Sequence, residues 1–247
     1  MKQTHNDDLR VVTLNIDWNK NLNRILPFLS SCLADVVCLQ EVLEEDVRLI
    51  SRVAGKYHFY VPMCGGKIHG AKGTVGIAIF SRLPIYQKNA SYYVGDPIRI
   101  VELDERTLES RRETTYRALA FCEVHKGDVT YRIATTHFTW TPDGKADEFQ
   151  RADLQKMLGI LKDKQYVLCG DFNAPRGGEI YKTLSQCMKD NVPLSYDTSI
   201  DPERHRIKGL RAMVDGLFTT PGYAVSQVAM HFGVSDHGAL EAVVSRE

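Results

Sequence analysis

Polar and ionisable side chains stand at the ends of several apolar runs, where they could carry out chemistry. Asn15 follows RVVTL, Glu41 follows VVCLQ and His137 follows IATT. Asp171 and Asn173 close the run YVLCGDFN. A carboxylate at the edge of a hydrophobic core loses water, so it must be paired, hydrogen-bonded or bound to a cation. These run ends predict a shared polar site.

The C-terminal part of the chain adds further candidates. Asp215 lies inside MVDGLF, and Asp236 and His237 come just before the run GALEAV. Taken singly, each acid could cap a helix or a turn, and each histidine could be an ordinary core or surface residue. Their recurrence at several independent run ends favours a functional site.

The residue types indicate metal-dependent phosphate chemistry. Carboxylate and amide oxygens without cysteine suit a hard cation such as Mg²⁺ or Mn²⁺. Asparagine and histidine can donate hydrogen bonds to charge that develops on a phosphoryl group, and an aspartate beside water can orient or deprotonate it. The sequence has no G-x-x-x-x-G-K-[ST] loop, which disfavours ATP-driven chemistry.

Apolar runs rich in Val, Ile and Tyr predict the strands that position these side chains. The predicted strands are Leu9–Asn15, Asp35–Gln40, Tyr57–Val61, Thr74–Ser81, Tyr116–Val124, Val129–Thr136, Tyr166–Gly170, Ala212–Phe218, Val225–Met230 and Ala239–Val244. The predicted helices are Leu22–Ser31, Glu44–Val53, Ala146–Leu161 and Gly178–Gln186. The third helix should bury one face made by Phe149, Leu154, Met157, Leu158 and Leu161.

This many strands with few helices predicts an α+β (α/β) fold in which two mixed β-sheets pack face to face and are covered by helices. The absence of repeats and linkers predicts a single domain over residues 1–247.

Composition limits the class of partner. Thirty-one Lys and Arg balance 31 Asp and Glu, which argues against tight, sequence-independent binding of a long nucleic acid. The six cysteines include no C-x-x-C pair and predict thiols in a reducing compartment. The polar N-terminus and the lack of a long apolar run predict a cytoplasmic monomer with no membrane span.

Two polar segments, Asp96–Glu113 and Ser195–Arg211, are either solvated loops or the rim of a site that selects substrate. Basic and aromatic residues offer two interpretations: they either bind a nucleic acid or are ordinary surface features. These residues are Arg111, Arg112, Arg117, Arg204, Arg206, Lys208, Arg211, Trp18, Trp140, Tyr92 and Tyr93.

The ordered segments LNIDW, CLQEV, GTVGIAIFSRLPI, ATTHFTW, LCGDFNAP, VDGLF and SDHGAL resemble the endonuclease/exonuclease/phosphatase superfamily of metal-dependent phosphoesterases. The resemblance covers nearly the whole chain and implies a four-layer αββα sandwich. It implies that Glu41 is the principal metal ligand, with Asn15 beside it, and that Asp236 is an additional carboxylate on the metal side.

The same resemblance assigns the remaining roles. It implies that Asp171 positions the attacking water and that the Asn173 amide contacts phosphate. His237 resembles the family's imidazole that faces the scissile phosphate, with Asp215 orienting it, and His137 resembles a second phosphate-binding histidine. The resemblance leaves open whether Asp171 or His237 removes the water proton. We favour Asp171 orienting the nucleophile and a protonated His237 stabilising the transition state.

The sequence departs from the family pattern at two positions. Gly216 follows Asp215 where the family usually has a bulky residue, which predicts a more open pocket wall. His137 stands where abasic-site endonucleases of the exonuclease III type usually carry Tyr. This histidine is more typical of the branch with 5′-tyrosyl-DNA phosphodiesterases, pancreatic-type deoxyribonucleases, deadenylases and sphingomyelinases.

The favoured function is a Mg²⁺-dependent phosphoesterase, most simply a phosphodiesterase, that hydrolyses its substrate by in-line attack of water. A DNA or RNA nuclease, or a DNA-end-processing phosphodiesterase of the same family, is the alternative. A catalytically inert binding domain is the alternative from another class, and the retained set of polar residues counts against it.

Overall fold

The predicted strands pair into two mixed sheets in the computed structural model, which describes residues 7–68, 71–96 and 98–247. The first sheet, in spatial order, contains β11 (Tyr223–His231), β12 (Ala239–Arg246), β1 (Leu9–Asn15), β2 (Val36–Leu43), β4 (Ala71–Ser81) and β3 (Tyr57–Ile68). The second contains β5 (Ile85–Val94), β6 (Arg117–Lys126), β7 (Val129–His137), β8 (Val167–Asp171), β10 (Asp215–Thr219) and β9 (Lys189–Asp190).

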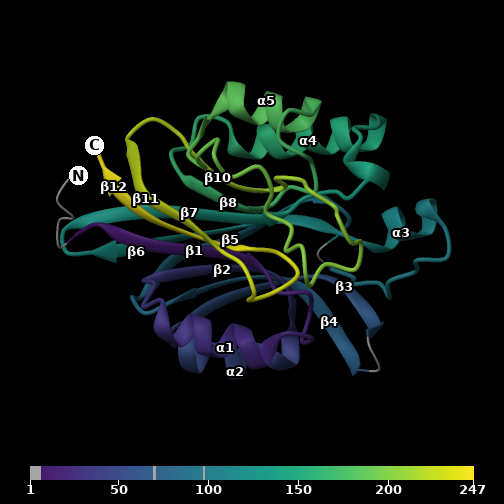
Figure 1. Cartoon of the computed structure of the whole chain (residues 1–247), viewed down its shortest axis with the longest axis horizontal. Helices are drawn as coiled ribbons and strands as arrows, with labels where there is room; N and C mark the ends of the chain where they lie inside the picture. Colours follow the sequence, from purple (N-terminus) through teal and green to yellow (C-terminus); the bar gives the residue numbers. More distant parts are fainter. Residues whose placement is uncertain (1–6, 69–70, 97) are drawn as a thin grey trace.

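Helices cover the outer faces of both sheets (Figure 1). The described helices are α1 (Leu22–Ser31), α2 (Val47–Ala54), α3 (Leu108–Thr114), α4 (Glu148–Leu161) and α5 (Glu179–Cys187), with short 3₁₀ turns at Glu44–Asp46 and Pro142–Gly144. Helices α1 and α2 lie on the first sheet, and α4 and α5 lie on the second. This arrangement confirms the four-layer αββα sandwich. No helix in the described ranges is long and apolar enough to span a membrane.

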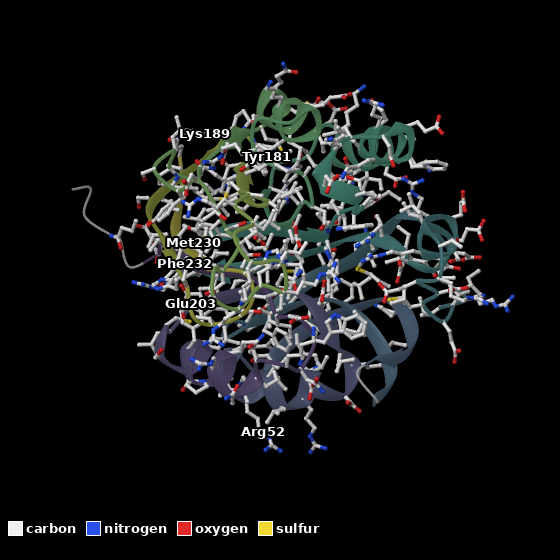
Figure 2. All side chains as sticks on the ribbon, turned by 45° about the vertical axis from the view of Figure 1, so that its right-hand side comes forward. Arg52, Tyr181, Lys189, Glu203, Met230 and Phe232 are labelled. Atoms are coloured by element: carbon white, nitrogen blue, oxygen red, sulfur yellow. The ribbon has the colours of Figure 1, made fainter. Side chains whose placement is uncertain are left out.

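Three large apolar cores of the described residues hold the layers together. The central core fills the space between the sheets and includes Leu9, Ile77 and Tyr131. The other two cores lie between each sheet and its helices. Figure 2 shows side chains filling these interlayer spaces, whereas Arg52 projects from the outer face of α2 into solvent. The central strands of each sheet are therefore buried on both faces, which explains why they are continuous apolar runs rather than alternating patterns.

A buried amide links the two sheets below the polar strand ends. Gln40 is fully buried, and its side-chain nitrogen donates to the hydroxyl of Thr13 at 3.2 Å and to that of Thr135 at 3.1 Å. Thr13 belongs to the first sheet and Thr135 to the second. Because buried polar groups are costly without partners, this bridge favours one relative placement of the sheets.

Strand register brings the polar ends to one edge of the sandwich. In the second sheet, His137 of β7 is paired in parallel with Asp171 of β8. Asp215 of β10 is paired with the same aspartate in antiparallel register. In the first sheet, β1 and β2 run parallel, so Asn15 lies opposite Gln40, next to Glu41.

The structure also corrects several sequence predictions. Strands β5 and β9 and helix α3 were not predicted, and β5 is missed because its exposed side chains are mostly polar. The predicted strand from Ala212 begins only at Asp215, and β3 extends beyond Val61 to Ile68. Phe149 is 49% exposed, so the prediction that it belongs to the buried face of α4 is wrong. Its ring instead stacks under the guanidinium of Arg112.

Candidate active site

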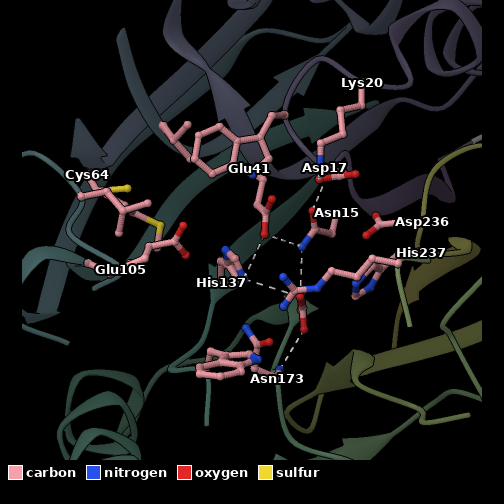
Figure 3. A pocket seen from close by; sticks show the side chains of 18 of the residues that line it. Asn15, Asp17, Lys20, Glu41, Cys64, Glu105, His137, Asn173, Asp236 and His237 are labelled. Atoms are coloured by element: carbon pink, nitrogen blue, oxygen red, sulfur yellow. Dashed lines mark hydrogen bonds and ion pairs between the residues drawn. The ribbon is translucent and has the colours of Figure 1, made fainter. Parts of the chain in front are cut away.

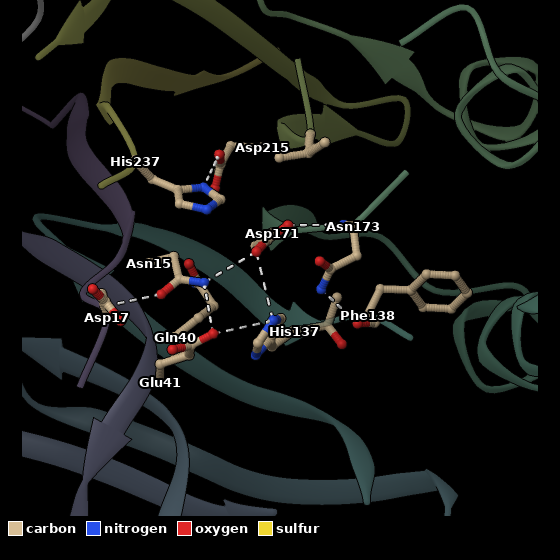
Figure 4. Close-up of polar contacts among 12 residues, drawn as sticks. Asn15, Asp17, Gln40, Glu41, His137, Phe138, Asp171, Asn173, Asp215 and His237 are labelled. Carbon is tan, nitrogen blue, oxygen red and sulfur yellow. Dashed lines mark hydrogen bonds and ion pairs between the residues drawn. The ribbon is translucent and has the colours of Figure 1, made fainter. Parts of the chain in front are cut away.

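Asn15 joins the carboxylates of the two sheets (Figure 4). Its amide nitrogen donates to Asp171 Oδ2 at 3.0 Å and lies 3.3 Å from Glu41 Oε1. Its amide oxygen accepts the backbone N–H of Asp17 at 3.1 Å, which sets the orientation of the amide. A single buried asparagine thus holds two acidic side chains from different sheets within one hydrogen-bond network.

The backbone is strained where the site residues leave the strands. Glu41 has a φ of +57° and Asn173 has a φ of +49°, in a region that residues other than glycine rarely adopt. Glu41 also lies in a β-bulge, since the pairing of β2 with β4 shifts between Leu39 and Val42. A bulge redirects a side chain, and strain of this kind clusters at functional sites. These features aim Glu41 into the space between the strand ends.

Asp171 is the most enclosed carboxylate of the network. It is 1% exposed, and its Oδ1 accepts the backbone N–H of Asn173 at 2.8 Å. His137 Nε2 lies 3.5 Å from Asp171 Oδ2 and 3.8 Å from Glu41 Oε1. The side-chain nitrogen of Asn173 donates to the carbonyl of Phe138 at 3.0 Å. The carboxylate is therefore held in one orientation with an imidazole beside it.

Asp215 and His237 form a buried pair on the other side of Asp171. His237 Nδ1 lies 2.7 Å from Asp215 Oδ2, the distance of a strong hydrogen bond to a carboxylate. The Ser199 hydroxyl accepts the backbone N–H of Asp215 at 3.1 Å and anchors the strand start. This pairing leaves the opposite edge of the imidazole free to meet a ligand.

Gly216 does not open the pocket wall. A Cβ at this position would lie 2.6 Å from the ring of Phe218 and 2.9 Å from that of Phe172. These two rings pack edge to face within the core between the second sheet and its helices. The prediction of a more open wall is wrong, because the space that the missing side chain leaves is occupied by aromatic rings.

Crowding of acids shifts their protonation. Burial, with the nearby charge of Asp236, raises the pKa of Glu41 to about 7. Burial raises the pKa of Asp171 to about 6, even though the charge of His237 opposes the shift. The folded protein therefore holds carboxylates that are costly to ionise together, which is the electrostatic signature of a site that binds a cation.

The two histidines are shifted in opposite directions. Burial and the nearby charge of Arg117 hold the pKa of His137 well below its usual range. Burial also disfavours the charged form of His237, but the Asp215 carboxylate outweighs it and raises the pKa of His237 well above its usual range. These shifts favour a neutral imidazole at His137 and a protonated imidazole at His237.

The donor set fits a hard divalent cation. Glu41 and Asp236 supply carboxylate oxygens and Asn15 supplies an amide oxygen, and all three side chains face the same space (Figure 3). Atoms of Asp171, Asp215 and His237 also lie within 4.8 Å of one another and could hold a metal. In that second cluster one Asp215 oxygen is already bonded to His237, and the raised pKa of Glu41 makes the first cluster the stronger candidate.

These side chains open into a cleft with a volume of about 410 Å³. Both polar segments contribute to its rim: Leu103, Glu105 and Arg111 come from the first, and Arg204, His205 and Arg206 from the second. Both segments therefore border this cleft. The floor contains seven of the eight predicted residues, which are Asn15, Glu41, His137, Asp171, Asn173, Asp236 and His237. Asp215 lies behind His237.

The basic and aromatic candidates divide into two groups. Trp18 and Trp140 line the cleft, and the Arg111 guanidinium lies 4.2 Å from the centre of the Trp140 ring. Tyr92 and Tyr93 do not face it, because their hydroxyls bond the Pro62 carbonyl and the Thr136 hydroxyl. Lys208 and Arg211 are likewise outside the cleft lining, and Arg211 pairs with Asp197 at the surface.

Arg117 is the site residue whose environment the sequence did not reveal. The sequence places Arg117 among scattered basic residues, whereas in the structure it is 5% exposed and lines the cleft. The sequence does contain one indication of its burial: Arg117 begins the apolar run RALAFCEV, where a charge must be buried.

Comparison with models of protein families identifies the family of this chain. The model of the endonuclease/exonuclease/phosphatase family matches residues 12–237. The chain belongs to this family. Members are metal-dependent hydrolases that act on phosphoester bonds, in agreement with the acidic and histidine clusters of the cleft. A search of the curated proteins gives no match.

Solved structures share the fold of this family member at low sequence identity. An endonuclease/exonuclease/phosphatase from Bacteroides vulgatus is 18% identical over 97% of this chain and 99% of its own, with a TM-score of 0.68. The human Nocturnin catalytic domain with bound sulfate is 17% identical over 98% and 94%, with a TM-score of 0.70. A mannosyl-6-phosphatase from Bacteroides thetaiotaomicron is 13% identical over 96% and 99%, with a TM-score of 0.65.

Proposed function

We propose that this family member is a Mg²⁺-dependent phosphodiesterase that hydrolyses its substrate by in-line attack of water. The observation that carries the proposal is the raised pKa of Glu41 among converging oxygen donors, because such a cluster is stabilised by a hard cation. Glu41, Asn15 and Asp236 would hold the ion, and Mn²⁺ would fit the same donors. Bound there, the ion would polarise the phosphoryl group and offset its charge.

In this proposal Asp171 positions the attacking water. Its carboxylate is held by Asn15 and by the backbone N–H of Asn173, and a pKa of about 6 suits a group that exchanges a proton near neutral pH. The Asn173 side chain and His137 are proposed to contact phosphate oxygens. Neutral His137 can donate one N–H to an oxygen without adding charge.

His237 is proposed to stabilise the transition state as an imidazolium. Asp215 accepts its Nδ1 proton at 2.7 Å, so Nε2–H is free to donate toward the phosphoryl oxygens. Keeping the imidazole charged requires the buried carboxylate behind it, which is the role proposed for Asp215. The imidazolium of this pair would thus place its positive charge on the side of Asp171 opposite His137.

The domain proposed to carry this activity extends over residues 1–247 and acts as a monomer. A cytoplasmic location is proposed from the cysteines, all six of which are free thiols.

A nucleic-acid phosphodiester is the second candidate substrate. The stack of Arg111 on Trp140 at the cleft favours it, because aromatic and guanidinium planes bind exposed bases. Binding of single-stranded DNA that falls steeply with salt would support this substrate, and no binding at low salt would count against it. A catalytically inert binding domain would instead fold normally and fail to bind Mg²⁺.

The test is hydrolysis of bis(p-nitrophenyl) phosphate with and without Mg²⁺, by the wild type, Glu41→Gln and Asp171→Asn. We expect Mg²⁺-dependent turnover in the wild type and at least a hundredfold loss in both variants. Glu179→Gln is the matched control, because Glu179 is exposed on α5 and pairs with Arg151 at 2.7 Å. Full activity of both site variants would refute the assignment. A screen of abasic DNA, 5′-tyrosyl DNA, oligo(A), sphingomyelin, inositol phosphates and nucleotides would then name the substrate.

A further inference from the structure

Arg117 carries a buried charge for which the folded chain supplies little compensation. The residue begins β6 and is 5% exposed. Its Nη1 donates to the backbone carbonyl of His137 at 3.1 Å, and it forms no ion pair with a carboxylate of the described residues. Burial lowers the pKa of Arg117 and the charge of Arg111 acts in the same direction, whereas the charge of Asp171, which forms no ion pair with it, offsets only part of this shift. A buried cation in such surroundings is costly unless an anion joins it.

Other shielded guanidiniums of this chain are compensated in the usual way. Arg176 pairs with Asp190 at 3.0 Å and also donates to backbone carbonyls, including that of Val192 at 2.9 Å. Arg112 forms an ion pair with Asp147. The contrast indicates that the counter-charge of Arg117 comes from outside the polypeptide.

Arg117 has donor nitrogens that no acceptor of the described residues uses. Nε and Nη2 have no acceptor among the described residues, and neither is sealed from solvent. The residue lines the catalytic cleft and also an adjoining cavity of about 230 Å³, so it stands in the wall between them. Its one hydrogen bond holds the guanidinium against the backbone of His137, next to the imidazole proposed to contact phosphate.

We propose that Arg117 binds the phosphoryl group of the substrate from the wall of the cleft next to His137. The inference rests on the proposed function and adds a residue to it. A phosphate offers the negative charge that Arg117 lacks and can accept two parallel N–H donors from one guanidinium. A cation held by the metal-side carboxylates and Arg117 would then contact the phosphate from different directions, which would restrict how the phosphorus is presented to water.

Binding of inorganic phosphate, the simplest probe of this group, tests the inference without turnover. Calorimetric titration in MgCl₂ would compare the wild type, Arg117→Gln and Arg117→Lys. We expect about 10- to 100-fold weaker phosphate binding by Arg117→Gln, in the range of a lost charge-assisted hydrogen bond, and a smaller loss for Arg117→Lys, which keeps the charge. Arg48→Gln, an exposed position on α2, is the matched control and should bind phosphate as the wild type does.

Thermal unfolding without phosphate supplies the second measurement. Because the proposal leaves the Arg117 charge uncompensated in the free protein, Arg117→Gln should melt at the same temperature as the wild type or higher, and phosphate should stabilise the wild type more. Unchanged phosphate affinity in Arg117→Gln and Arg117→Lys, or unfolding of Arg117→Gln, would overturn the inference. Absence of Mg²⁺-dependent hydrolysis in the wild type would instead refute the proposed function, so the two failures are distinguishable.

Discussion

Replacing Asp215 by Asn should move the pH dependence of catalysis in a direction that the structure dictates. The substitution keeps the shape of the side chain and removes the charge that lies 2.7 Å from His237. Asp215 is 1% exposed, its Oδ1 has no hydrogen-bond partner, and its charge acts on His237 and also raises the pKa of Asp171. Without it, burial lowers the pKa of His237 and only the charges of Asp171 and Asp236 remain to oppose that shift.

The expected size follows from the lost interaction. A hydrogen bond between charged groups contributes about 1.5–3 kcal/mol, and about 1.4 kcal/mol corresponds to one pKa unit, so the pKa of His237 should fall by roughly one to two units. Since the imidazolium is the proposed active form, activity is present below the pKa of His237 and is lost as pH rises through it. The alkaline limb of kcat/KM should therefore shift to lower pH by the same amount.

The assay is the pH profile of bis(p-nitrophenyl) phosphate hydrolysis, combined with an NMR titration of the His237 ring in protein with and without Mg²⁺. Asp197→Asn removes a surface carboxylate that pairs with Arg211 and serves as the control, with an unchanged profile expected. A variant that loses activity equally at every pH, with an unshifted His237 resonance, would refute the reasoning.

Three further substitutions test the fold and its electrostatics. In metal-free protein the pKa of Glu41 is raised from 4.5 to about 7. Ionisation of Glu41 therefore does not reduce the free energy of unfolding below pH 4.5, and it reduces this free energy as the pH rises through 7. Glu41→Gln should accordingly stabilise the metal-free protein by up to about 3 kcal/mol at pH 8 and little at pH 4.5 in urea unfolding, and equal effects at both values would contradict the shift. Gly170→Ala should destabilise by more than about 2 kcal/mol, because its Cβ would lie 2.0 Å from the Thr136 carbonyl oxygen and its φ is +147°. Gly159→Ala in α4, where nothing lies within 4 Å of the added Cβ, should instead raise stability by about 0.5–1 kcal/mol, and a lower melting temperature would show that the helix environment is misjudged.

The site could be predicted from the sequence because its residues follow apolar strands directly. Parallel pairing of β7 with β8 places His137 opposite Asp171, and pairing of β1 with β2 places Asn15 opposite Gln40 and next to Glu41. Once these runs are identified as strands, the convergence of their ends follows from sheet geometry. The two-sheet fold was predictable for the same reason.

Features without a local sequence pattern could not be predicted. Strand β5 carries polar residues on an exposed surface and has no apolar periodicity. The packing of Phe172 and Phe218 against Gly216 depends on contacts between segments far apart in the sequence. The same holds for Arg117, which forms no ion pair with a carboxylate of the described residues. The bulge that turns Glu41 into the cleft likewise has no local signature.

Calorimetric titration of metal-free protein with Mg²⁺ tests the central claim most directly. The wild type should bind the ion and release protons near pH 7, because Glu41 must ionise to become a ligand. Glu41→Gln should lose this binding, whereas Glu179→Gln should retain it. Equal Mg²⁺ binding by the wild type and Glu41→Gln, or no binding by the folded wild type, would contradict a metal-dependent active site at these strand ends.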